Sequence, residues 1–134
     1  MERLIIHVDI SGCFEVSSGA DTVRLLPFTG HCDGGVFRGD ILPGGVDTQR
    51  SRSGQGGLSA RYMLEGEDYT GQPCRIFIEN EAPIGAPFTR PRVITDSKAL
   101  GWLNTSRLAG RLLDENGSLT IEIGLAEDIT GGKL

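Results

Sequence analysis

The segment Leu119-Thr120-Ile121-Glu122-Ile123-Gly124-Leu125 alternates strictly between large apolar residues and residues that are polar or small. Side chains of a β-strand point alternately to opposite faces, so this period of two predicts a strand that is buried on one face. The preceding Asn116-Gly117 dipeptide is the strongest hairpin signal of the chain, because both residues tolerate the positive φ of a type I′ turn. We therefore expect an antiparallel hairpin that ends in this strand.

The same alternation recurs along the rest of the chain. It predicts clear strands over 4–10, 58–65 and 74–80, and weaker strands over 23–28, 36–42 and 100–112. Seven or more short strands with hairpin-type spacing are typical of an antiparallel barrel or sandwich. The expected core residues lie on the apolar faces of the clear strands: Ile6, Val8, Ile78, Ile121 and Ile123.

Glycine and proline separate the predicted strands. Turns or loops are expected at Asp33-Gly34-Gly35, at Pro43-Gly44-Gly45 and over 53–57. The stretch 82–97 contains three prolines and is expected to be an irregular excursion, with a short helix near 97–100. The fold class is therefore all-β, with little helix.

The length and composition set the class of protein. A chain of 134 residues with 38% apolar and 23% charged residues is typical of one globular domain, here spanning 1–134. The 13 basic and 18 acidic residues give a net charge of -5, which disfavours nucleic acid and anionic membrane surfaces as partners. We therefore expect neither nucleic-acid nor membrane binding.

Cysteine usage and the N-terminus bear on the compartment. Three cysteines are an odd number with no close pair, which favours reduced thiols over a secreted disulfide framework. The first residues enter an alternating segment without the apolar region of a signal peptide, and no apolar run approaches the roughly 18–20 residues of a membrane span. The expected location is the cytoplasm.

No sequence motif indicates a cofactor. The glycines lack the spacing of a dinucleotide or phosphate-binding loop, and a Ser-centred nucleophile elbow is absent. His31-Cys32-Asp33 places three potential metal ligands side by side, but adjacent residues of an extended segment point in opposite directions. His7 could join them only through folding, so we expect no metal. His31 is also a candidate general base near neutral pH, although the sequence shows no partner for it.

Polar residues on otherwise apolar faces indicate a binding pocket. Gly44 and Gly45 allow a sharp turn, after which Asp47 and Gln49 share one face of an extended segment. The alternative is an Asx-capped turn that enters a strand. Four further residues belong to apolar faces of predicted strands: Tyr62, Asn80, Trp102 and Asn104. A tyrosine in this position is normally part of the core, and each asparagine either caps a strand end or orients a ligand in an apolar barrel mouth.

Several of these segments together resemble domain-of-unknown-function family 3237, also called uncharacterised protein family 0311. The family pattern consists of LPGG-x-D-x-Q, then ARY-x-L, then an Asn that closes the next strand, then WLN. This chain matches the pattern over roughly positions 28–126. The matching residues are Ile41-Leu42-Pro43-Gly44-Gly45-Val46-Asp47-Thr48-Gln49, Ala60-Arg61-Tyr62-Met63-Leu64, Asn80 and Trp102-Leu103-Asn104. The resemblance implies an antiparallel β-barrel similar to the allene oxide cyclase and dirigent type, and implies no known activity. Thr48 departs from the family, where a Trp is frequent, which implies a larger or more polar pocket at that point.

The resemblance selects the same positions as the alternation pattern and adds Arg61. Arg61 lies on the face opposite Tyr62, so unless a bulge redirects it, it contacts a second subunit of a homo-oligomer and not the pocket. Carried over residue by residue, the motif residues of the family are Gly45, Asp47, Gln49, Arg61, Tyr62, Asn80, Trp102 and Asn104.

The leading hypothesis is a small-molecule pocket at one mouth of the barrel that serves a cofactor-independent lyase, isomerase or cyclase. Asp47 would act as general acid or base and Tyr62 as an acid or hydrogen-bond donor, while Trp102 supplies a stacking wall. Gln49, Asn80 and Asn104 would orient a small, partly apolar, uncharged or anionic substrate. The alternatives are a non-catalytic small-molecule-binding protein and a structural or assembly subunit, the last being incompatible with a cavity of roughly 300 Å³ or more.

Overall fold

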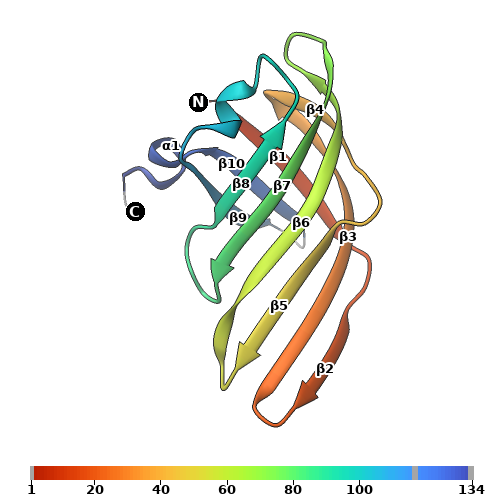
Figure 1. Cartoon of the computed structure of the whole chain (residues 1–134), viewed down its shortest axis with the longest axis vertical. Coiled ribbons are helices and arrows are strands. Elements are labelled where there is room, and N and C mark those ends of the chain that lie inside the picture. The colour runs from red at the N-terminus through yellow and green to blue at the C-terminus, as the bar shows by residue number, and fades with distance from the viewer. Residues whose placement is uncertain (1, 116–117, 133–134) are drawn as a thin grey trace.

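The computed structural model of the chain describes residues 2–115 and 118–132. Within these residues, apart from a short 3-10 helix, η1 (Gly101–Asn104), and α1 (Ala126–Thr130), all regular structure is β-strand (Figure 1). The strands are β1 (Arg3–Ile10), β2 (Phe14–Ser18), β3 (Asp21–Gly35), β4 (Phe37–Ile41), β5 (Val46–Arg52), β6 (Gln55–Asp68), β7 (Pro73–Pro83), β8 (Arg90–Thr95), β9 (Leu108–Glu115) and β10 (Ser118–Leu125).

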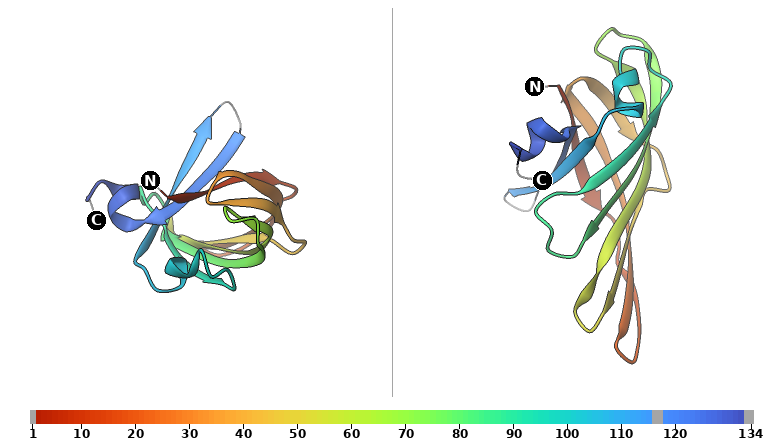
Figure 2. Two further views of the ribbon diagram at one scale, coloured as in Figure 1. Left: turned by 90° about the horizontal axis from the view of Figure 1, so that it is seen from above. Right: turned by 60° about the vertical axis from the view of Figure 1, so that its left-hand side comes forward.

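All strand pairings are antiparallel, and the sheet closes into a barrel. Neighbouring strands follow the order β8-β7-β6-β4-β3-β1-β10-β9. The two ends of this order meet at Thr89 and Gly110, whose backbones exchange hydrogen bonds of 2.8 and 3.1 Å. The ring of strands is visible from above in Figure 2. The predicted antiparallel β-barrel is confirmed.

Two long strands carry an extension beyond the barrel. The first part of β3 pairs with β2 and β5, whereas its second part pairs with β1 and β4. The long strand β6 likewise pairs first with β5 and then with β4. Strands β2 and β5 and the first parts of β3 and β6 therefore form a sheet extension, here called the arm, that projects from the barrel (Figures 1 and 2). Phe14 and Val16 are exposed on the arm.

The alternation of the sequence corresponds to the inside and the outside of the barrel. The five residues predicted for the core are all buried: Ile6, Val8, Ile78, Ile121 and Ile123. They pack in one cluster with residues from most of the other strands, so a single core fills the barrel. The clear strands predicted over 4–10, 58–65, 74–80 and 119–125 are confirmed and extend one to several residues further.

The weaker strands predicted over 23–28 and 36–42 are confirmed as part of β3 and as β4, whereas other predictions needed correction. The strand predicted over 100–112 is wrong in its first half, where η1 forms before β9 begins at Leu108. The excursion predicted over 82–97 contains β8, which includes Pro91; β8 lies at one end of the strand order, where a residue without an N–H is tolerated. The predicted turn at Asp33-Gly34-Gly35 is part of β3. The short elements β2 and α1 were not predicted, and the Asn116-Gly117 turn lies outside the described residues.

A buried carboxylate holds the turn between β6 and β7. Asp68 accepts hydrogen bonds from the Thr70 backbone N–H at 2.9 Å, from the Thr70 hydroxyl, and from the Ser97 hydroxyl at 2.7 Å. Ser97 in turn accepts a hydrogen bond of 3.1 Å from the backbone N–H of Leu100, just before η1. This network holds η1 at the end of the barrel that lies opposite the arm.

We expect this network to make the stability of the folded protein depend on pH in the acidic range. Hydrogen bonds from Thr70 and Ser97 hold the pKa of Asp68 below its ordinary value, which is about 3.9. A lowered pKa contributes stability that is complete above the ordinary value and disappears as pH falls through the lowered one. Asp68→Asn should therefore lower the melting temperature at pH 7 and flatten its decline below about pH 4. If the melting temperatures of the two proteins declined in parallel as pH falls below about 4, this role of Asp68 would be contradicted.

Within residues 2–115 and 118–132, no helix has the length and apolar character that crossing a bilayer requires.

Candidate functional site

A cavity of about 380 Å³ lies at the end of the barrel from which the arm projects. The inner faces of β1, β5, β6 and β7 form one side of it, and the loop between β7 and β8 and the β9–β10 hairpin form the other. Most of the wall is apolar, with few polar side chains among its residues, as is typical of small-molecule sites. The apolar wall is built by Val8, Ile10, Phe28, Leu58, Ala60, Ala82, Leu112, Leu119 and Ile121.

Asp47 and Gln49 enter this cavity together from β5. Their spacing of two places them on one face, as predicted, and the Gln49 side-chain amide donates a hydrogen bond of 2.9 Å to Asp47 Oδ2. The other oxygen, Asp47 Oδ1, is buried and has no hydrogen-bond partner within the described part of the chain. Burial raises the pKa of Asp47, and the Gln49 hydrogen bond opposes this effect in part. Asp47 therefore faces the cavity as a carboxyl group that takes up a proton more readily than a solvated one.

Two further oxygen atoms in the wall lack partners among the described residues. Asn80, on β7 and 3% exposed, leaves Oδ1 unpaired, and Thr89, at the barrel closure, leaves Oγ1 unpaired. Both residues line the same cavity as Asp47. An unpaired buried polar group costs about 1–3 kcal/mol, so these three atoms are the polar groups of the wall whose hydrogen-bonding capacity the described residues leave unused.

Tyr62 lies deeper than the cavity. Its side chain is 3% exposed and packs edge-on against Phe28, with ring centroids 5.2 Å apart. Its hydroxyl is buried without a partner within the described residues, and burial raises its pKa above the ordinary value. Because Phe28 lines the cavity and Tyr62 does not, Tyr62 supports the cavity wall through Phe28.

Gly44 and Gly45 form the predicted turn, which joins β4 to β5. Gly44 has φ +108°, a conformation that favours glycine. A Cβ on Gly45 would lie 3.2 Å from the Phe28 ring, and the Gly45 carbonyl accepts a hydrogen bond of 3.0 Å from the Phe28 backbone N–H. The turn thus positions Phe28 and leads into Asp47, without lining the cavity itself.

The structure does not bring Trp102 and Asn104 to this cavity. Both were placed on a strand by the sequence pattern, but they belong to η1. The Asn104 side chain accepts a hydrogen bond of 2.7 Å from the Thr95 backbone N–H and donates one of 3.1 Å to the Thr95 carbonyl. It therefore satisfies the backbone at the end of β8, while Trp102 packs partly buried against the core.

Arg61 points away from the cavity. It is exposed on the outer face of β6, directly across from Val46 of β5 and Glu79 of β7. No bulge redirects it, because both of its pairings keep a regular register along β6. Of the two alternatives for Arg61, the position in the pocket is wrong, and the contact with a second subunit stays a prediction.

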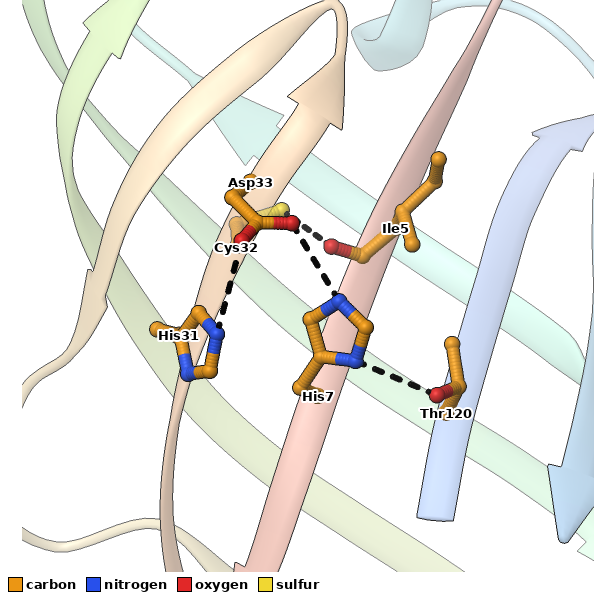
Figure 3. A network of polar contacts seen from close by, with 6 residues as sticks. All are labelled: Ile5, His7, His31, Cys32, Asp33 and Thr120. Atoms are coloured by element: carbon orange, nitrogen blue, oxygen red, sulfur yellow. Dashed lines mark hydrogen bonds and ion pairs between the residues drawn. The ribbon is translucent and has the colours of Figure 1, made fainter. Parts of the chain in front are cut away.

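His31 also lies outside the cavity, but it has partners that the sequence did not reveal. It faces outward from β3, directly across from His7 of β1, with ring centroids 4.9 Å apart. The Asp33 carboxylate lies 3.3 Å from His7 Nε2 and 3.7 Å from His31 Nε2 (Figure 3). Cys32, between them in sequence, points inward, where its thiol donates to the Ile5 carbonyl and burial raises its pKa to about 12.

Two contributions to the cavity were not anticipated. Thr89 lies in the proline-rich stretch that was expected to be irregular, and its neighbours Gly85, Ala86 and Pro87 form part of the wall. Thr89 is the first polar residue after the run of apolar, glycine and proline residues over 82–88, and this was the signal available. A Cβ on Gly110 would lie 2.4 Å from Thr89 Oγ1, so a side chain at this position would displace the Thr89 hydroxyl.

Comparison with known proteins shows the fold. No family model and no curated protein sequence matches the chain, so the resemblance to family 3237 stays a prediction. Among solved structures, a protein of unknown function from Clostridium acetobutylicum is 23% identical, with a TM-score of 0.75 over 92% of this chain and 93% of that one. A beta-barrel like protein from Acinetobacter baumannii is 21% identical, with a TM-score of 0.70 over 91% and 92%.

An enzyme from Penicillium herquei is similar as well. It is 17% identical, with a TM-score of 0.65 over 90% of each chain. These identities are low, so the similarities establish a shared β-barrel and nothing about activity.

Proposed function

We propose that this protein binds a small, partly apolar organic molecule in the cavity beside Asp47 and acts on it as a cofactor-independent lyase, isomerase or cyclase. The observation that carries the proposal is the set of three unpaired buried oxygens, on Asp47, Asn80 and Thr89, around one cavity of about 380 Å³. A cavity of this size also argues against a purely structural or assembly role.

The polar atoms of the wall indicate what the ligand carries. Asp47 Oδ1 and Asn80 Oδ1 are acceptors without donors among the described residues, so a matching ligand presents hydroxyl or N–H groups to them. Asp47 is the one ionisable side chain in the described wall, and its carboxylate would repel an anion. These features support an uncharged, hydroxyl-bearing ligand over an anionic one.

A single carboxyl group suits chemistry in which one proton moves within the substrate. Asp47 would accept a proton from one position of the substrate and return it to another, so that the net reaction needs no oxidant, reductant or metal. Its raised pKa brings it closer to the operating pH of a general base. Among the three reaction types, this arrangement supports isomerisation or cyclisation most directly.

A specific observation also favours the non-catalytic alternative. Asp47 is hydrogen-bonded to Gln49 and to neither Tyr62 nor His31, so the described wall offers no second acid–base group. A binding protein that uses the same cavity is therefore the second candidate function. Turnover distinguishes the two, because only an enzyme changes the bound molecule.

Asp47→Asn tests the site. The raised pKa of Asp47 means that its contribution to stability is present below its ordinary pKa of about 3.9 and is lost as pH rises through the raised value. Replacing the desolvated carboxylate at pH 7 should therefore leave the melting temperature equal or higher, while ligand binding falls tenfold or more. Neutral phenols and hydroxylated cyclic ketones are suitable probes, screened by thermal shift and titrated by NMR.

Asp9→Asn is the matched control, since it removes the same charge from an exposed position on β1. It should change neither the binding of these probes nor their turnover. If Asp47→Asn lost stability but bound the probes unchanged, Asp47 would cap the turn before β5 and would not serve the cavity. Mass spectrometry of each bound probe after incubation then separates an enzyme from a binding protein.

A further inference from the structure

The outer surface of the barrel carries a compact group of three potential metal ligands, formed by His7, His31 and Asp33. His7 comes from β1, and the other two come from the adjacent strand β3. One nitrogen or oxygen of each residue lies within 4.8 Å of the corresponding atoms of the other two. Figure 3 shows the three side chains turned toward one another. This group lies on the outside of the barrel wall, whereas Asp47 lies inside it.

A β-bulge lies at Asp33, next to the histidines. Leu4 pairs with Gly35 and Ile6 pairs with Cys32, so Asp33 and Gly34 together stand opposite the single residue Ile5. Two residues facing one bend a strand and redirect its side chains, and bulges are frequent next to functional sites. Gly34 has φ +76°, which glycine adopts without strain. The local backbone is thus shaped so that a carboxylate reaches the pair of imidazoles.

Two of the three distances in this group, made by different oxygens of Asp33, are close to the ligand spacing around a tetrahedral ion. Zinc bonds of about 2.0–2.1 Å to nitrogen and oxygen put neighbouring ligand atoms about 3.3 Å apart. The carboxylate of Asp33 lies 3.3 Å from His7 Nε2 and 3.7 Å from His31 Nε2. Two imidazoles and one carboxylate leave the fourth position of a tetrahedron to water or to another ligand.

The hydrogen bonding of His7 is compatible with a cation at this point. His7 Nδ1 lies 3.2 Å from the Thr120 hydroxyl on β10. When Nδ1–H donates to Thr120, the lone pair of Nε2 faces an oxygen of Asp33, and two acceptors meet unless a proton or a metal ion lies between them. A histidine that ligates a metal through one nitrogen usually donates its other N–H in this way. Thr120 therefore holds the His7 imidazole in the orientation in which Nε2 could coordinate a metal ion.

We propose that His7, His31 and Asp33 form a surface site for a divalent transition-metal ion, with zinc as the reference ion and Thr120 as the positioning residue of His7. Imidazole nitrogens with one carboxylate suit zinc, copper and nickel better than calcium or magnesium, which prefer oxygen ligands. The negative net charge of the chain adds attraction for a cation. The bound ion would join β1 to β3 at the bulge.

Zinc titration of tag-free protein, stripped with EDTA and desalted, tests the proposal. Isothermal titration calorimetry should show one zinc ion bound per chain, and zinc should raise the melting temperature because it binds the folded protein selectively. Co²⁺ in place of zinc should give the visible absorption bands of a tetrahedral site. Anomalous scattering from a zinc-soaked crystal should place the ion between His7, His31 and Asp33.

The variants assign the ligands. His31→Gln and Asp33→Asn should each weaken zinc binding more than about tenfold, and Thr120→Val about tenfold, which is typical of a residue that orients a ligand. Asp40→Asn is the matched control, because it removes a carboxylate beside His31 without removing a ligand. Cys13→Ser controls for the exposed thiol. Both controls should bind zinc as tightly as the unchanged protein, and all variants should keep its circular dichroism spectrum.

Three results would overturn the proposal. The first is a titration of the unchanged protein without stoichiometric binding. The second is equal weakening by Asp40→Asn and Asp33→Asn, which would indicate diffuse attraction by negative charge. The third is anomalous density elsewhere, for example at Cys13. Since the zinc titration uses neither Asp47 nor an organic probe, its outcome is independent of the proposed function.

Discussion

The Gly66→Ala variant is expected to lose about 3 kcal/mol or more of its free energy of unfolding, at the upper end of the cost of overpacking. Gly66 of β6 stands directly across from Gly39 of β4. A Cβ on Gly66 would lie 2.0 Å from the Arg38 carbonyl oxygen, and a Cβ on Gly39 would lie 2.2 Å from the Glu65 carbonyl oxygen. Both obstacles are backbone atoms, so the two strands must separate and lose ladder hydrogen bonds.

Urea denaturation at 25 °C measures this loss. Gly101→Ala is the matched control, because nothing lies within 4 Å of the Cβ that it adds and its φ is not in the left-handed region. The control should change the free energy of unfolding by less than about 0.5 kcal/mol. If Gly66→Ala were as stable as Gly101→Ala, the close approach of β4 to β6 would not be required for the barrel.

The Ile78→Ala variant should lose about 2–5 kcal/mol, because it removes three buried carbon atoms and leaves a cavity. Ile78 is 0% exposed and lies in the middle of β7, between Tyr62 of β6 and Val93 of β8. Neighbours on both sides belong to hydrogen-bonded strands, so they cannot move in freely to fill the space. The same urea titration measures the loss.

Ile94→Ala provides the comparison with the outside of the barrel. Ile94 lies on β8, next in sequence to Val93, and is 70% exposed. Its removal should cost less than about 0.5 kcal/mol. Similar losses for Ile78→Ala and Ile94→Ala would mean that the inner and outer faces of these strands have been assigned incorrectly.

Most of the fold could be predicted from local patterns. The alternation in β1, β6, β7 and β10 identified both the strands and their buried faces, because a period of two is imposed by the backbone of each strand alone. Errors came where the pattern was ambiguous. Apolar spacing around Trp102 fits a strand as well as a short 3-10 helix, and the prolines near β8 concealed an end strand that tolerates them.

The candidate site could be predicted only in part. Asp47 and Gln49 are two residues apart on one strand, so their common direction follows from the sequence, and so does the opposite direction of Arg61 relative to Tyr62. Asn80 was assigned correctly to an inner face. Thr89 and the loop wall were missed, because a loop has no periodicity from which its direction can be inferred.

The sequence by itself determined the all-β class, the strand faces and the direction of Asp47, since each depends on residues within a few positions of one another. Tertiary structure alone decided which segments meet. The closure at Thr89 and Gly110, the bulge at Asp33 and the contact of His7 with Thr120, 113 positions apart, all depend on strand order and register. Register is set by the packing of the whole barrel, because a shift of one residue would turn every inward side chain outward.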